Sequence, residues 1–284
     1  MIELPECVVL ARQINQTLRG KRIEHAEANH SPHGFAGYNI DPAEYDGMLA
    51  GRQISSANPG TGFSCGGNTE INCEDRFLVL STPIRYHPAG AKLPAKHQLC
   101  LTFDDGSHLT CTVKMWGALL CLPSNPDEWG DGEPPWEIAI RKTPSPLEDA
   151  FDEAYFQTLT QAIDPKLSVK AVLATGQRIP GLGNGVLQDI LFRARLHPKR
   201  KFVSLSDPER FELYSAVKST LRLMAEQGGR DTEKDLFGNP GGYRTILSKK
   251  TLDKPCPVCG GALCREAYLG GNIYFCPTCQ PLEE

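Results

Sequence analysis

The sequence predicts an α+β protein in which a helix and a set of strands are followed by helices and a cysteine-rich end. Apolar residues recur at helical spacing near the start, and alternating strand patterns continue to about residue 122. Two CxxC pairs stand near the C-terminus. With 284 residues, 40% of them hydrophobic, the chain is long enough for two modest domains.

The first segment predicts a helix with a single apolar stripe. Pro5 stands near its start and Gly20 just past its end, where these residue types are favoured. Residues 1–4 therefore lie on the approach to a helix N-terminus. The stripe consists of Cys7, Leu10, Ala11, Ile14 and Leu18.

Strand patterns dominate from residue 21 to about residue 122. Phe77 to Leu80 is a short apolar run, and residues 99–103 alternate apolar with polar side chains. Asp104-Asp105-Gly106 supplies turn chemistry before a second alternating run over 109–113, which predicts a hairpin. The glycine-rich stretch over 58–68 is expected to be a loop.

Helices are expected after a linker over 123–146 that is rich in proline and acidic residues. The first spans 151–163, the second is capped by Ser168, and the third runs over 186–195. Ser206 and Glu209 form a capping box that opens a longer helix, and Gly228-Gly229 ends it.

The two CxxC pairs predict one structural zinc ion. Their cysteines, Cys256, Cys259, Cys276 and Cys279, present two thiolates from each of two tight turns. A segment this short buries little core, so the metal would supply its folding free energy. Cys264 is expected to lie outside the metal site. The other six of the eleven cysteines are scattered, and a disulfide framework is not expected in a reducing compartment.

The formal charge of −4 hides a basic segment over 165–201. Eight basic side chains there face a single acid, Asp189. The same segment holds the turn Gly181-Leu182-Gly183-Asn184-Gly185, which leads into a helix. Glycine amides and a helix N-terminus can hold a phosphate. The alternatives are an ordinary turn between helices and a solvated helix face.

These residues resemble the formamidopyrimidine-DNA glycosylase / endonuclease VIII (Fpg/Nei) family. Residues 180–198 are similar to its helix-two-turns-helix motif, and the CxxC pairs to its zinc-finger hairpin. Glu3-Leu4-Pro5-Glu6 is similar to the family N-terminus. The resemblance implies an N-terminal helix and β-sandwich domain over 1–122, a linker over 123–146, a helix-two-turns-helix domain over 147–250 and a zinc hairpin over 251–284.

The resemblance also implies a function. Family members evert a damaged base from duplex DNA, cut its glycosidic bond with the amine of an N-terminal proline, and cleave the strand by β-elimination. The implied partner is damaged or abasic double-stranded DNA. The protein is expected to be a monomer that does not bind a membrane and that lies in the cytoplasm, associated with the nucleoid. The residues expected to hold DNA are Gly183, Asn184, Lys114, Arg193, Arg195 and Lys199.

The chain departs from the family where the chemistry takes place. Ile2 stands at the position of the proline, Gly62 at that of a phosphate-binding lysine, and Gly271 at that of the hairpin arginine. Glu3 and Glu6 are retained as candidate acid/base residues, and the Met1 amine is a substitute nucleophile.

Several functions therefore remain open. The chain could be a bifunctional glycosylase that attacks through Met1, or a divergent or monofunctional glycosylase in which Glu3 activates water. It could also bind damaged DNA without catalysis. A zinc hairpin that binds protein or RNA is a further class, against which the basic segment argues. We expect strand-cleaving lyase activity to be weak or absent.

Overall fold

The computed structural model describes residues 2–60, 67–125, 128, 144–175 and 178–282. It divides the chain into two compact units. One unit comprises residues Met1–Lys142 together with Glu233–Pro240, and the other comprises Thr143–Thr232 together with Gly241–Glu284. Among the described residues, no helix is both long enough and apolar enough to span a bilayer. The predicted α+β class is confirmed.

The first unit opens with helix α1 (Leu4–Thr17), which confirms the predicted leading helix. Pro5 lies in its first turn, where a missing N–H is tolerated. Every residue of the predicted apolar stripe is buried. Gly20 follows the helix with a φ of +88°, a backbone conformation that L side chains rarely adopt.

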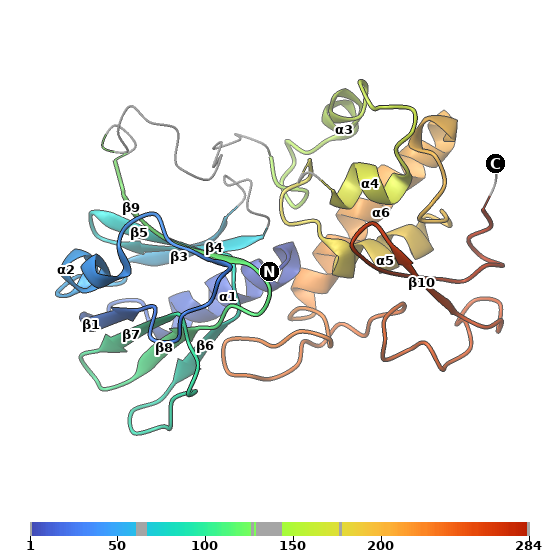
Figure 1. The fold of residues 1–284 in the computed structure, drawn as a ribbon. Coiled ribbons are helices and arrows are strands. Elements are labelled where there is room, and N and C mark those ends of the chain that lie inside the picture. Colours follow the sequence, from blue (N-terminus) through green and yellow to red (C-terminus); the bar gives the residue numbers. More distant parts are fainter. Residues whose placement is uncertain (1, 61–66, 126–127, 129–143, 176–177, 283–284) are drawn as a thin grey trace. The chain divides into compact units, whose positions relative to one another are not determined.

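Two sheets share one apolar core with α1 (Figure 1). The first contains β1 (Ile23–Ala28), β7 (Leu99–Phe103), β8 (His108–Cys111) and β6 (Ile84–His87), in that spatial order. The second contains β2 (Ala36–Gly37), β9 (Gly117–Pro123), β5 (Arg76–Leu80), β4 (Asn68–Cys73) and β3 (Ser56–Gly60). A short 3-10 turn (Pro42–Glu44) and α2 (Tyr45–Leu49) lie between β2 and β3.

Strands β7 and β8 pair antiparallel, which confirms the predicted hairpin. The loop expected over 58–68 is wrong at both ends, because β3 extends to Gly60 and β4 begins at Asn68. Pro59 favoured a loop in the sequence, because proline has no N–H to donate to the hydrogen bonds between strands. Strand β3 lies at the sheet edge, where proline is tolerated. Gly62 lies outside the described residues, as does most of the predicted linker over 123–146.

A short segment from late in the chain packs into the first unit. Leu236 is fully buried in the sandwich core, although the chain before Glu233 and after Pro240 belongs to the other unit. Its N–H donates to Gln13 Oε1 at 2.9 Å, and its carbonyl accepts from the N–H of Tyr86 at 2.9 Å. The segment Glu233–Pro240 is thus a structural part of the sandwich unit.

The second unit is helical. It contains α3 (Glu153–Leu159), α4 (Val169–Ala174), α5 (Asn184–Arg193), a 3-10 turn (Phe202–Ser204) and α6 (Asp207–Glu226). Ser168 caps α4 by accepting from the N–H of Ala171, and both halves of the Ser206–Glu209 capping box form at the start of α6. Both caps were predicted, whereas α3 is shorter than the expected 151–163.

The unit ends in a β-hairpin of β10 (Cys264–Tyr268) and β11 (Gly271–Phe275). Leu269 and Gly270 both have positive φ, at +48° and +72°, as a tight two-residue hairpin turn requires. Cys256 and Cys276, near the base of this hairpin, share an apolar cluster with Phe192 of α5. The helix-two-turns-helix segment and the hairpin therefore belong to one compact unit.

Candidate functional site

Four cysteines at the base of the hairpin form a metal centre. Their Sγ atoms all lie within 4.8 Å of one another. The distance is 3.7 Å between the sulfurs of Cys256 and Cys279 and 3.4 Å between those of Cys259 and Cys276. A tetrahedral zinc ion with Zn–S bonds of about 2.3 Å needs sulfurs about 3.8 Å apart. The distances and the donor set fit one structural zinc ion, as predicted.

The surroundings of these sulfurs act in both directions, since burial raises the pKa of Cys276 and of Cys279. The Gly261 N–H donates to Cys259 Sγ at 3.4 Å, and this hydrogen bond lowers the pKa of Cys259 to about 7. Cys264 lies on β10 and, in the described part of the chain, is not one of the clustered ligands. Four protein ligands leave no open position on the metal, so its role is structural.

Buried polar side chains of α5 hold the hairpin and the segment before it. Gln188 accepts from the Tyr274 N–H at 2.9 Å and donates to the Asn272 carbonyl at 3.2 Å. The Asp189 carboxylate accepts from Tyr243 Oη and from the amides of Ile246 and Leu247, at 2.8–3.0 Å. Burial raises the pKa of Asp189, while these three donors favour its charged form.

The N-terminus of α5 meets the hairpin close to its turn. Gly183 is the N-cap residue, and Asn184 Nδ2 donates to the Asn272 carbonyl at 2.9 Å. Gly271 packs beside that amide, and a Cβ at this position would lie 3.4 Å from Asn184 Nδ2, at van der Waals distance. The predicted Gly-Asn turn therefore lies beside Gly271 of the hairpin. A helix N-terminus of this kind can bind a phosphate.

Two lysines complete this region. Lys199 pairs with Glu266 of β10, and its Nζ lies 5.5 Å from the centre of the Tyr268 ring. Lys170 is buried and donates to the Tyr268 carbonyl at 2.6 Å, and burial lowers its pKa. Lys170 belonged to the basic segment but was not among the predicted site residues, because sequence alone does not bring α4 to the hairpin. We call Gly183, Asn184, Lys199, Tyr268 and Gly271 the hairpin-tip region.

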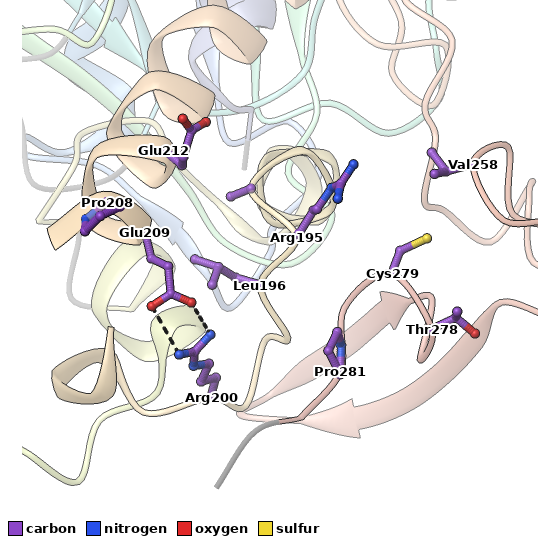
Figure 2. Close-up of a pocket in the computed structure, with 11 residues that line it drawn as sticks. Arg195, Leu196, Arg200, Pro208, Glu209, Glu212, Val258, Thr278, Cys279 and Pro281 are labelled. Atoms are coloured by element: carbon purple, nitrogen blue, oxygen red, sulfur yellow. Dashed lines mark hydrogen bonds and ion pairs between the residues drawn. The ribbon is translucent and has the colours of Figure 1, made fainter. Parts of the chain in front are cut away.

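The other predicted arginines lie at the far end of α5. Arg193 is in its last turn and Arg195 follows it, so both are about 15 Å along the helix from Asn184. Arg195 has a φ of +55° and lines a pocket of about 550 Å³ with Val258, Cys279 and the Arg200–Glu209 ion pair (Figure 2). The structure thus separates these arginines from the hairpin-tip region within the same unit.

The N-terminus of the first unit holds the predicted catalytic residues. Ile2 is 5% exposed, belongs to the sandwich core and pairs with Gly67 in an antiparallel bridge. Glu3 is the half-buried N-cap residue of α1, and Glu6 is buried in its first turn. Met1 lies outside the described residues, so the position of its amine is not described.

Gly67 is packed tightly over the start of the chain. A Cβ at this position would lie 2.7 Å from the Ile2 carbonyl oxygen and 2.9 Å from the Glu3 backbone. No side chain fits there unless the backbone shifts. Lys114, the remaining predicted DNA-binding residue, is exposed between β8 and β9 beside Met115, which is 77% exposed.

The described residues thus form one unit with two sheets around a leading helix, and one helical unit that ends in a four-cysteine hairpin. No protein-family model matches the chain. The formamidopyrimidine-DNA glycosylase of Geotalea daltonii is 29% identical to it and covers 99% of this chain and 100% of its own length. That of Vibrio cholerae is 36% identical over 148 residues, 51% of this chain and 54% of its own.

Solved structures agree on the fold. The MutM (Fpg) protein of Thermus thermophilus matches with a TM-score of 0.78 at 23% identity, over 99% of this chain and 100% of that one. The Lactococcus lactis Fpg in complex with abasic-site DNA matches at 0.80 with 20% identity, over 98% and 99%. The chain is therefore similar along its whole length to formamidopyrimidine-DNA glycosylases, as its motifs predicted, and it shares their fold.

Proposed function

We propose that this chain is a DNA-repair protein that binds damaged or abasic duplex DNA, and that its strand-cleaving lyase activity is weak or absent. One observation carries the second part. Ile2, at the position of the family's catalytic proline, is buried in the core of a chain that otherwise keeps the Fpg fold along its whole length. The scaffold is retained, while the attacking group is replaced.

The hairpin-tip region supports the DNA-binding part. The N-terminus of α5, with Gly183 as its N-cap residue, carries partial positive charge that favours an anion. Lys199 and the Asn184 amide lie beside it, and the tip is fixed by zinc at its base and by Gln188 along its length. Related Fpg chains have been solved with abasic-site DNA and with DNA containing a benzylated Fapy-dG lesion.

The N-terminal geometry supports the weak lyase activity. Imine formation needs an unhindered amine within reach of the sugar carbon, and good positioning lowers the barrier by roughly 7–11 kcal/mol. Isoleucine has no side-chain nucleophile, and its backbone nitrogen is an amide wherever Met1 is retained. The bridge to Gly67 fixes Ile2 in the core, so that residue cannot move to approach a substrate.

A second candidate is a monofunctional glycosylase, which Glu3 favours. Glu3 is half-buried at the N-terminus of α1, and a carboxylate is a residue type that accepts a proton from an attacking water. Such an enzyme would release a damaged base and leave the strand intact. A binder without catalysis would also leave the strand intact but would release no base, so the two candidates differ only in base release.

The test is binding by fluorescence anisotropy to a duplex with a tetrahydrofuran abasic analogue, with the undamaged duplex and a structured RNA as comparisons. We expect tighter binding to the abasic analogue than to either comparison. Equal binding to all three would contradict the proposal. A base-release assay on duplexes containing oxidised bases, with a Glu3→Gln variant, then separates the two candidates.

A further inference from the structure

We propose a second divalent-metal site in the first unit, formed by Glu27, His30 and His97 and suited to zinc. The three side chains offer one carboxylate oxygen and two imidazole nitrogens, all within 4.8 Å of one another. Two histidines and a glutamate are a ligand set that zinc accepts. The site belongs to the sandwich unit and is separate from the four cysteines of the other unit.

His97 is the fixed ligand. Its ring is 4% exposed, and its Nδ1 lies 3.0 Å from the Pro94 carbonyl oxygen. A carbonyl only accepts, so Nδ1 must carry the proton, and Nε2 of a neutral ring then carries a lone pair. Nε2 is buried and has no hydrogen-bond partner among the described residues. A buried nitrogen without a partner is costly, and a metal ion would satisfy it.

The carboxylate lies where such an ion would be bound. Glu27 Oε2 is 3.6 Å from His97 Nε2, too long for a hydrogen bond. Two ligands of one tetrahedral ion, each about 2.1 Å from the metal, lie roughly 3.4 Å apart. The separation therefore fits two ligands of a shared cation better than a direct imidazolium–carboxylate hydrogen bond.

His30 supplies the third ligand from a short segment held against His97. The N–H of Asn29 donates to the Gln98 carbonyl at 2.8 Å, and the N–H of Ser31 donates to the His97 carbonyl at 3.0 Å. The His30 ring stacks on that of His97 with centroids 4.3 Å apart, and its Nδ1 lies 2.9 Å from Glu27 Oε1. His30 is 44% exposed and has room to turn toward a shared metal.

Metal binding replaces the proton between His30 and Glu27. In the absence of metal, the Glu27 carboxylate accepts the hydrogen bond from His30 Nδ1. The proton on His30 Nδ1 leaves to solvent, and that nitrogen takes the metal instead. The bound ion would link the segment after β1 to the segment before β7, and it would stabilise the unit by an amount that grows with the logarithm of the free zinc concentration.

The test is calorimetric titration of Zn²⁺ into the full chain already holding one equivalent of zinc. We expect one further equivalent to bind, and none in His30→Ala or Glu27→Gln. The matched control is His25→Ala. His25 lies on β1, as Glu27 does, and its Nδ1 pairs with the Asp46 carboxylate at 2.7 Å. Among the described residues, no third ligand lies beside that pair. The His25→Ala variant should still bind the further equivalent of zinc.

Thermal unfolding gives a second measurement. Added zinc should raise the melting temperature of the wild-type chain and of His25→Ala, and leave that of His30→Ala unchanged. His30 is exposed, so its removal should not prevent folding, and circular dichroism checks this. No further equivalent in the wild type, or loss of it in His25→Ala as well, would overturn the proposal.

Discussion

At the scale of the residue, the proposal of weak lyase activity depends on Ile2 and on Gly67, which packs against it. The two residues form an antiparallel bridge, and the Ile2 side chain fills the sandwich core. A small residue at position 67 lets the start of the chain lie flat against the strand that follows. We therefore expect the packing that stabilises the N-terminus also to hold Ile2 away from a substrate.

Gly67→Ala should destabilise the chain. The added Cβ would lie 2.7 Å from the Ile2 carbonyl oxygen, and relieving that contact requires a backbone shift costing about 1–3 kcal/mol. The free energy of unfolding, measured with urea, checks this expectation. Gly34→Ala is the control, because nothing lies within 4 Å of its Cβ position. Equal stability of the two variants would show that Gly67 is not tightly packed.

Ile2→Pro should restore strand cleavage only weakly. Proline would supply a secondary amine once Met1 is removed, but Gly271 still provides no cation at the hairpin tip. The measurement is the rate of abasic-site incision by Ile2→Pro and by the double variant Ile2→Pro/Gly271→Arg. We expect the double variant to be faster. A fully active single variant would show that the missing cations do not matter.

At the scale of the element, the zinc hairpin and α5 form one rigid support for the tip. Zinc holds the base of the hairpin, and Gln188 and Asn184 hold β11 along its length. Gln280 is fully buried and donates to the Leu196 carbonyl at 2.9 Å. This hydrogen bond holds the second cysteine pair against the segment that follows α5. Loss of the metal should therefore disorder the tip as well as the knuckles.

Cys256→Ser should lose its zinc and most of its affinity for DNA. Three thiolates cannot close the tetrahedron, and the hairpin has too little core to fold without metal. Elemental analysis after dialysis against a weak chelator measures the zinc content. Cys264→Ser, altered on the same hairpin but outside the cluster, should keep one equivalent. A full equivalent of zinc in Cys256→Ser would disprove the ligand set.

Lys199→Ala should weaken DNA binding for every sequence. Removing one phosphate contact lowers the slope of log affinity against log salt by about one unit. Arg195→Ala is the matched control, because Arg195 lies beyond the opposite end of α5. Anisotropy titrations at several salt concentrations give both slopes. If Arg195→Ala lowers the slope and Lys199→Ala does not, DNA approaches the other end of the helix.

Glu266→Gln should have the opposite effect. Glu266 pairs with Lys199 and places a negative charge on the strand leading to the tip. Removing that charge frees Lys199 for a phosphate and should tighten binding severalfold, by about 1 kcal/mol or less. The same titrations measure it. Weaker binding by this variant would mean that the ion pair is needed to position Lys199.

At the scale of the whole molecule, local signals predicted the elements, and contacts between distant residues determined the rest. The helix stripe, the Ser206–Glu209 capping box and the CxxC spacing each concern neighbours in sequence, and each was confirmed. The burial of Leu236 in the sandwich was not predicted, because its partners lie about 150 or more positions earlier in the chain.

The site was predictable to the same extent. The Gly-Asn turn and the cysteines follow from sequence patterns, but the contact between Asn184 and Gly271 depends on how the hairpin docks. Five of the six residues expected to hold DNA are basic or polar, and that character does not say where in the fold each one lies. The structure separates Arg193 and Arg195 from Asn184 by the length of that helix.

We propose that this chain keeps the fold of formamidopyrimidine-DNA glycosylases, while its N-terminus no longer forms an imine with the DNA sugar. The most direct test is borohydride trapping on a duplex with an abasic site, with strand incision followed in the same reaction. An imine between a protein amine and the sugar becomes a permanent adduct on reduction. We expect DNA binding without an adduct and with little incision. Efficient incision with a trapped adduct would show that the Met1 amine attacks, and would contradict the claim.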